Sequence, residues 1–154
     1  MSVETSKHNK VKHHINGKHI RHSANNRIKP SVEVETTFLV KSSTPFISGV
    51  KKISKILDKF NKTINRTNRK YQGGEYKKVN YITVKGMGKA IPKTLSMASK
   101  FQDEMDFKVD ILTGSIEVLD EFEPDETKED SIEDTVYKKR KVSYIELRIW
   151  LKRE

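Results

Sequence analysis

Apolar positions fall into blocks that predict two helices and four strands after a polar N-terminal stretch. Residues 36–41 (TTFLVK) predict a short strand. Thr44 and Pro45 then offer an N-cap and a first-turn proline for a helix. The next apolar residues are spaced by four, three, four, three and four, which predicts a helix with one apolar stripe: Phe46, Val50, Ile53, Leu57, Phe60 and Ile64.

The second half of the chain predicts three strands and another helix. Residues 79–84 are apolar on both parities, as in a central strand buried on both faces. A glycine-containing turn, 85–89, leads into a helix with Pro92 in its first turn. Residues 108–119 and 142–151 predict two long strands. The order β-α-β-α-β-β predicts an α/β fold of the α+β sandwich type, with a mixed four-stranded sheet and two helices.

The first of these long strands changes the parity of its apolar residues. Val109 and Ile111 lie at odd positions, whereas Ile116 and Val118 lie at even ones. One extra residue near Gly114 would return all four to one face, so we expect a β-bulge there.

Composition divides the chain into a tail, residues 1–34, and a folded domain, residues 35–154. The tail is rich in Lys, His, Asn and Ser and has little apolar periodicity, so we expect it to be disordered. Residues 120–136 are acidic and contain a proline, which predicts a flexible loop that joins the last two strands as a long hairpin. Residues 65–78 predict a polar, basic loop with a Gly-Gly break.

The charge is segregated along the chain. The formal net charge is +10, and the sequence pI is near 9.7. Residues 120–135 hold nine acidic residues and one lysine, so the rest of the chain carries +18. Because a solvated surface usually mixes its signs, this excess indicates a polyanionic partner.

Several classes of protein are disfavoured by what the chain contains. It has no cysteine, which argues against disulfides and cysteine-based zinc sites. We expect no membrane association, since no apolar run is long enough to span a bilayer or to act as a signal peptide. All five histidines lie between His8 and His22 in the predicted tail, so we expect no metal site, no cofactor and no catalysis by this chain.

Two groups of basic residues are candidates for phosphate contact. Lys51, Lys55, Lys59 and Lys62 form a basic line on the first helix; the alternatives are an ordinary solvated face or contact with another subunit. The turn Lys85-Gly86-Met87-Gly88-Lys89, with Lys93, joins a strand to a helix N-terminus, where backbone N–H groups can hold a phosphate. It lacks the third glycine of a dinucleotide fingerprint and the Gly-Lys-Ser/Thr of a P-loop, so an ordinary tight turn is the alternative.

A third basic group, residues 138–141, includes Arg140 and Lys141 and lies at the base of the predicted hairpin. It is consistent with RNA contact, with a nuclear localisation signal, or with a soluble flank of an apolar strand.

Four segments together resemble the Alba superfamily: TTFLVKSSTPF at 36–46, GMGKAIPKT at 86–94, SIEVLDE at 115–121 and ELRI at 146–149. The likeness is greatest to the smaller Alba-like subunit shared by fungal ribonuclease P and ribonuclease MRP. It implies a non-catalytic accessory subunit of an RNA-based endoribonuclease, located in the nucleus and nucleolus. It also implies a heterodimer with a second Alba-like protein, contacts with other holoenzyme proteins, and binding to an internal-loop stem of the catalytic RNA.

The implied roles are precursor tRNA five-prime maturation and precursor rRNA processing, with telomerase RNA as a further ligand in some fungi. The resemblance assigns RNA contacts to Lys41, Ser42, Lys85, Gly86, Gly88 and Lys89, and adds Arg140 and Lys141 from the hairpin. Lys51, Lys55 and Lys93 complete the candidate set from the basic line and the second helix. The alternatives are a general Alba-type DNA/RNA-binding or chromatin protein, an interaction protein that acts through its acidic loop, and a nuclease.

Overall fold

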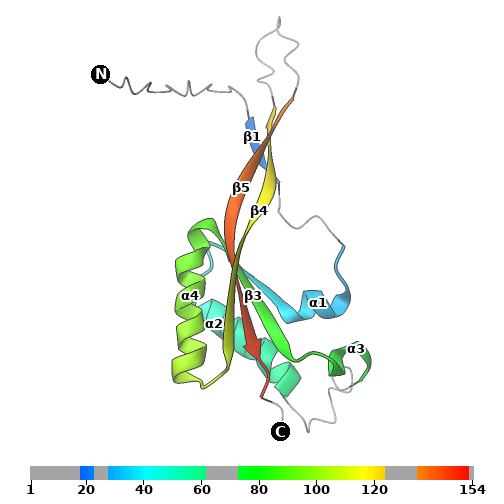
Figure 1. The fold of residues 1–154 in the computed structure, drawn as a ribbon, viewed down its shortest axis with the longest axis vertical. Coiled ribbons are helices and arrows are strands. Elements are labelled where there is room, and N and C mark those ends of the chain that lie inside the picture. Colours follow the sequence, from blue (N-terminus) through cyan, green and yellow to red (C-terminus); the bar gives the residue numbers. More distant parts are fainter. Residues whose placement is uncertain (1–17, 23–27, 62–72, 124–134, 153–154) are drawn as a thin grey trace, which may run out of the picture. The chain divides into compact units, whose positions relative to one another are not determined.

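The computed structural model describes residues 18–22, 28–61, 73–123 and 135–152 (Figure 1). Its main elements are two long helices and five strands, with two short helices and two irregular helical turns. They run in the order β1 (Lys18–Arg21), α1 (Ser31–Thr36), β2 (Thr37–Val40), α2 (Phe46–Asn61), α3 (Gly74–Lys77), β3 (Tyr81–Met87), η2 (Gly88–Ala90), α4 (Ile91–Ser99), η3 (Lys100–Glu104), β4 (Val109–Glu123) and β5 (Val136–Trp150). None of the described helices is long and apolar enough to cross a membrane.

The strands form a mixed sheet in the order β1-β4-β5-β3-β2. β2 is parallel to β3, whereas β3 is antiparallel to β5 and β1 is antiparallel to β4. From β2 onward, the predicted β-α-β-α-β-β order and the mixed sheet are confirmed. The sheet has five strands rather than four, because β1 adds a strand from within the predicted tail.

The chain folds as two compact units. The smaller unit comprises residues 1–23 and 118–140, and so contains β1 with the adjoining ends of β4 and β5. The larger unit comprises residues 24–117 and 141–154, and contains the helices and the rest of the sheet.

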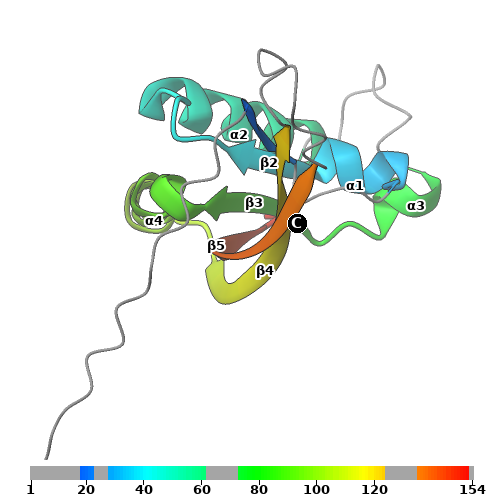
Figure 2. The ribbon, with the colours of Figure 1, turned by 90° about the horizontal axis from the view of Figure 1, so that it is seen from above.

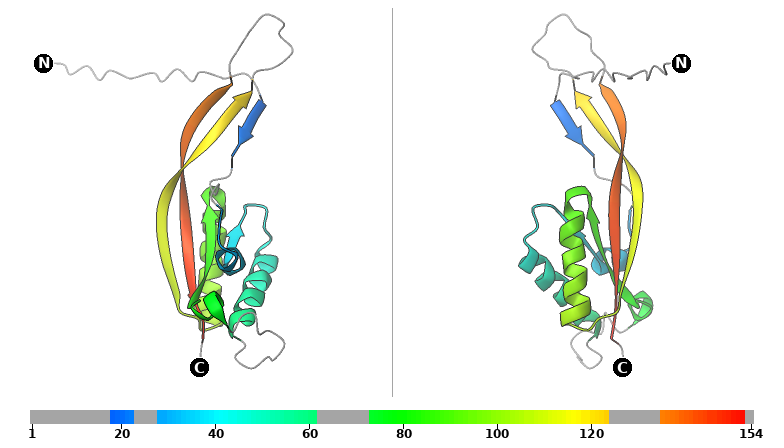
Figure 3. Two further views of the ribbon diagram at one scale, coloured as in Figure 1. Left: turned by 90° about the vertical axis from the view of Figure 1, so that its right-hand side faces the viewer. Right: turned by 60° about the vertical axis from the view of Figure 1, so that its left-hand side comes forward.

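The core of the larger unit lies between the sheet and the helices α2 and α4 (Figure 3). The predicted stripe of α2 is confirmed: Val50, Ile53, Leu57 and Phe60 are buried, while Ile64 lies outside the described residues. The two helices approach closely where Gly49 meets Met97, because a Cβ at Gly49 would overlap the Met97 side chain. Strand residues complete the core: Val40, Ile82, Val84, Ile145, Leu147 and Ile149.

Burial on β3 corrects the prediction of a strand buried on both faces. Ile82, Val84 and Gly86 are buried, but the intervening side chains are partly exposed. The reason is that α2 and α4 pack on one face only, so the other face keeps contact with solvent. β3 also runs on to Met87, which places Lys85 and Gly86 in the strand rather than in the following turn.

Two predicted loops and the tail contain helix or strand residues. The predicted tail, 1–34, contains β1 and the start of α1, while 1–17 and 23–27 lie outside the described residues. The predicted acidic loop, 120–136, is shorter than expected, because β4 extends to Glu123 and β5 begins at Val136; residues 124–134 are not described. The predicted loop 65–78 contains α3, and its residues 65–72 are not described.

The expected β-bulge rested on a shared buried face that the structure does not show. Val109 packs against the core, but Ile111 is 49% exposed. Gly114 has a different importance, since a Cβ there would lie 2.7 Å from the Tyr144 ring on β5. A glycine at this position lets the tyrosine ring lie directly against the neighbouring strand.

Candidate nucleic-acid interface

The turns that follow β2 and β3 lie at one edge of the sheet, because the two strands are adjacent and parallel. The first turn is closed by Thr44, whose hydroxyl accepts a hydrogen bond from the Lys41 N–H (3.0 Å) and whose own N–H donates to the Lys41 carbonyl (3.0 Å). The second turn contains Gly88 and leads through η2 into α4.

Lys93 joins these two turns. Its ammonium, in the first turn of α4, donates to the backbone carbonyls of Ser42 (2.7 Å) and Thr44 (2.6 Å). The structure therefore places Lys93 as a bridge inside the site, which fixes the position of the β2 turn relative to the helix N-terminus.

The two glycines of the sequence motif have different roles. Gly86 is buried in β3, and a Cβ there would overlap Thr94 Oγ1 and lie 2.9 Å from Thr94 Cβ. It allows α4 to pack closely on β3. Gly88 is exposed and has φ +52°, a left-handed conformation that glycine adopts without strain. Gly88 therefore forms the turn itself.

The candidate lysines of the two turns also separate into groups. Lys41, Ser42 and Lys89 are exposed at the shared edge. Lys85 instead faces away from the core, and its ammonium lies 3.3 Å from Glu146 Oε2. The accessible part of the predicted motif is therefore Lys41, Ser42, Gly88 and Lys89.

Lys51 and Lys55 lie on α2, where they line a hollow of about 500 Å³ together with Lys41 and Lys52. The hollow lies between α2 and the edge strand β2, and its lining includes the apolar residues Phe38, Leu39 and Pro45. Sequence periodicity predicted the basic line but not the hollow, which depends on how α2 packs beside β2.

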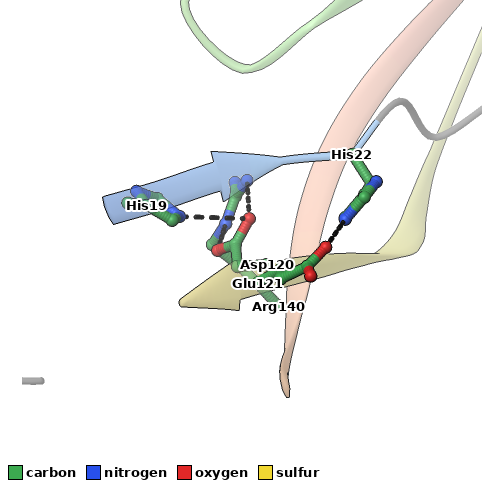
Figure 4. A network of polar contacts seen from close by, with 5 residues as sticks. All are labelled: His19, His22, Asp120, Glu121 and Arg140. Atoms are coloured by element: carbon green, nitrogen blue, oxygen red, sulfur yellow. Dashed lines mark hydrogen bonds and ion pairs between the residues drawn. The ribbon is translucent and has the colours of Figure 1, made fainter. Parts of the chain in front are cut away.

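In the smaller unit, Arg140 is bound to Asp120 on the neighbouring strand (Figure 4). Its Nε and Nη2 donate to the two carboxylate oxygens at 2.7 and 3.1 Å. The hydrogen bonds from Arg140 hold the pKa of Asp120 below its usual range, although burial acts in the opposite direction. The same pair raises the pKa of Arg140. Lys141, the other predicted hairpin contact, is exposed on β5 in the larger unit.

Two histidines attach β1 to β4, a role that the sequence prediction of a solvated tail missed. His19 Nε2 lies 3.6 Å from Asp120 Oδ1, and its ring stacks on Phe122 at 4.6 Å between centroids. His22 Nε2 lies 2.6 Å from Glu121 Oε2 (Figure 4). Across the described residues, no cluster of three or more His, Asp or Glu side chains has an arrangement that could hold a metal ion.

A second feature that sequence reasoning missed is an aromatic cluster in the larger unit, on the sheet face opposite the core. The rings of Tyr81 and Trp150 lie 5.3 Å apart, and the indole N–H donates to Asp110 at 2.6 Å. Lys108 and Arg148 lie over these rings at 4.9 and 5.1 Å. Tyr81 and Trp150 therefore make these ring, hydrogen-bond and cation–π contacts with residues of the same unit.

Comparison with known proteins assigns the chain to a family. The family model described as the Rpp20 subunit of nuclear RNase MRP and P matches residues 33–148. The chain belongs to this family. The match includes both turns, Lys93 and the basic residues of the hairpin. The resemblance to a protein subunit shared by RNase P and RNase MRP is therefore confirmed, and as a member of the Rpp20 family this chain is a protein component of those two enzymes.

A curated relative of the Rpp20-family chain agrees with this assignment. The chain is 39% identical over 127 residues to the ribonucleases P/MRP protein subunit POP7 of Saccharomyces cerevisiae, which covers 77% of this chain and 81% of that protein. Among solved structures, Alba from Thermoplasma volcanium aligns with a TM-score of 0.38 and 18% identity, over 74% of this chain and 98% of that one.

Proposed function

We propose that this Rpp20-family protein is a non-catalytic RNA-binding subunit that holds structured RNA at the edge formed by the turns after β2 and β3. The observation that supports this most directly is the Lys93 bridge, which fixes the β2 turn relative to the start of α4. Exposed Lys41 and Lys89 then present two cations on a rigid edge, beside the backbone N–H groups of the Gly88 turn.

Phosphate neutralisation supplies most of the affinity in this proposal. Paired RNA hides its base edges in a deep, narrow groove, so a lysine-rich edge recognises its shape and phosphates. The RNA ligand is an internal-loop stem of the catalytic RNAs of RNase P and RNase MRP, and in some fungi telomerase RNA. Through it the protein supports precursor tRNA five-prime maturation and precursor rRNA processing in the nucleus and nucleolus.

A heterodimer with a second Alba-like subunit is the second part of the proposal. Two large apolar side chains on the helix side of the larger unit support it: Leu95 on α4 is 40% exposed, and Ile111 on β4 is 49% exposed. Because Val109 packs into the core, Ile111 faces the same side of β4 as the helices. Apolar side chains left exposed beside an incompletely covered sheet favour a protein partner. Other holoenzyme proteins would contact the remaining surface.

Crosslinking in cells, followed by sequencing of the RNA attached to this protein, tests the proposal. We expect the RNase P and MRP RNAs to be enriched, with crosslinks focused on one internal-loop stem. The alternative is a general Alba-type DNA/RNA-binding or chromatin protein, which would give a broad spread over messenger RNA or recovered genomic DNA. A competition titration separates the two as well, since the general binder holds duplex DNA as tightly as the stem.

A further inference from the structure

The hollow between β2 and α2 combines lysine side chains with a strand edge that pairs with no other described strand. We propose that it is a docking groove for an extended, acidic segment of another protein, which adds a strand to β2. This site is separate from the proposed RNA edge except at Lys41, which stands at the end of both. The proposal also answers the question left open by the sequence, whether the basic line of α2 contacts RNA or protein.

The edge of β2 is the first part of the argument. Among the described strands, β2 is the last in the sheet order and pairs with β3 alone. Alternate backbone N–H and C=O groups of an edge strand point away from the sheet and can pair with an added strand. β2 and α2 lie side by side at this edge (Figure 2). The edge therefore offers main-chain hydrogen bonds within reach of the helix.

The charge of the groove is the second part. Lys51, Lys52 and Lys55 line it on the α2 side, and Lys41 lines it at the end of β2. The part of the chain that the structure describes adds no acidic residue to this lining. Lys52 also lies over the Phe38 ring, with its ammonium 5.7 Å from the ring centroid. Four lysines in one hollow, with no acidic side chain among its described lining, favour an occupant with several carboxylates.

The two faces of an added strand would meet different surroundings. Successive side chains of a strand point to opposite faces of a sheet. Phe38 points toward the helices and packs against the core, whereas Leu39 points to the opposite face and is 38% exposed. An added strand would therefore present acidic side chains to the lysines of α2 and apolar side chains to Leu39. The occupant predicted by this geometry is a segment of alternating acidic and apolar residues.

The same features favour a peptide over RNA. RNA supplies phosphates for the lysines, but it has no repeating backbone N–H and C=O groups to continue a strand ladder. The apolar side chains of Phe38 and Pro45 in the hollow, and of Leu39 on the opposite face, also match aliphatic side chains better than a sugar-phosphate backbone.

The test uses the full chain and a fluorescein-labelled octapeptide of alternating Glu and Val. Fluorescence anisotropy should show saturable binding, weakened at least tenfold by Lys51→Glu with Lys55→Glu. The matched control, Lys78→Glu with Lys152→Glu, makes the same charge change outside the groove and should leave binding within twofold. If the groove variant alters the melting temperature, Lys51→Gln with Lys55→Gln replaces it, with a smaller loss in the same direction.

Three outcomes would overturn the proposal. A peptide in which prolines replace two central valines lacks the N–H groups that would pair with β2. If it binds as tightly as the Glu-Val peptide, charge attraction alone explains the binding. If a Lys-Val peptide binds as tightly as the Glu-Val peptide, the lysines of the groove do not select an acidic occupant. Displacement of the Glu-Val peptide by internal-loop stem RNA, with an equal loss of RNA affinity in the groove variant, would assign the groove to RNA. None of these outcomes decides the proposed RNA edge, because Lys89 lies outside the groove and Lys89→Ala alone tests that edge through the salt dependence of RNA binding.

Discussion

Lys93 and Ser42 are 51 residues apart in the sequence, yet the Lys93 ammonium donates a 2.7 Å hydrogen bond to the Ser42 carbonyl. Its second bond, to the Thr44 carbonyl, completes a bridge between α4 and the turn after β2. A lysine that sequence reasoning assigned to phosphate contact is thus engaged with the protein backbone. Lys93 is best described as a positioning residue for the proposed RNA edge.

Replacing this bridge should weaken RNA binding without changing its salt dependence. Lys93→Met keeps most of the side-chain length but removes both hydrogen bonds, at a cost of about 1 kcal/mol in the free energy of unfolding, since the bonds are partly exposed. We expect stem RNA affinity to fall several-fold while the slope of log K against log salt stays at the wild-type value. A slope reduced by about one would instead show direct phosphate contact.

The exposed lysines of the edge should behave in the opposite way. Lys41→Ala with Lys89→Ala removes two proposed phosphate contacts, so the salt slope should fall by about 1.4 to 1.8. The control, Lys78→Ala with Lys152→Ala, removes the same charge at the far ends of β3 and β5 and should keep the slope. Titration of stem RNA at several salt concentrations measures both; an unchanged slope in the edge variant would exclude Lys41 and Lys89.

The two glycines of the motif should respond differently to alanine. Gly86→Ala forces a Cβ against Thr94 and should lower the free energy of unfolding by about 1–3 kcal/mol, as overpacking does. Adding Thr94→Ala removes the hydroxyl that the new Cβ overlaps and should recover part of this loss. Chemical denaturation of the single and double variants measures the difference; equal stability of the two would refute the packing role.

Gly88→Ala should cost about 1–2 kcal/mol through backbone strain alone, because the space around Gly88 is open and only its φ of +52° is unfavourable. Gly88→Asn should be better tolerated, since asparagine enters this conformation more readily. Comparing the melting temperatures of the two variants tests the assignment, which fails if alanine is as stable as glycine.

Asp120 should make the stability of the smaller unit depend on pH in acid. Its pKa is lowered from 3.8 in the folded state, chiefly by the hydrogen bonds from Arg140. A lowered folded pKa means that the carboxylate stabilises the fold fully above about 3.8 and loses this contribution as the pH falls through the folded pKa. Hydrogen exchange of the β1 amides measures it. The difference between wild type and Asp120→Asn should be largest near neutral pH and should shrink below pH 3.8; a constant difference would contradict the assignment.

Sequence periodicity predicted those parts of the fold that depend on local patterns. The stripe of α2 holds because residues spaced by three and four share one face of any helix. The prediction for β3 was wrong about its second face, because apolar residues on both parities do not show whether a second layer exists to cover them. Leu39, Leu95 and Ile111 show the same point, since apolar character alone did not indicate which residues would remain exposed.

Long-range pairing explains most of what the sequence could not show. β1 has a short polar sequence, KHIR, and becomes a strand only by pairing with residues about 100 positions away on β4. The sequence pattern selected Lys85, Gly86 and Lys93 as candidate RNA contacts. Their partners in the structure, Glu146, Thr94 and Ser42, depend on tertiary packing that the pattern does not show. The basic character of the site was predictable from the sequence, whereas the contacts of each residue within it were not.

The pairing of Lys18 with Glu123 has a consequence for the segments attached to them. The chain enters β1 after residue 17 and leaves β4 before residue 124, so both segments are tethered at one point. Residues 1–17 hold three lysines, three histidines and one glutamate, whereas 124–134 hold six carboxylates and one lysine. The register of β1 with β4 therefore starts two stretches of opposite sequence charge at neighbouring positions of one sheet.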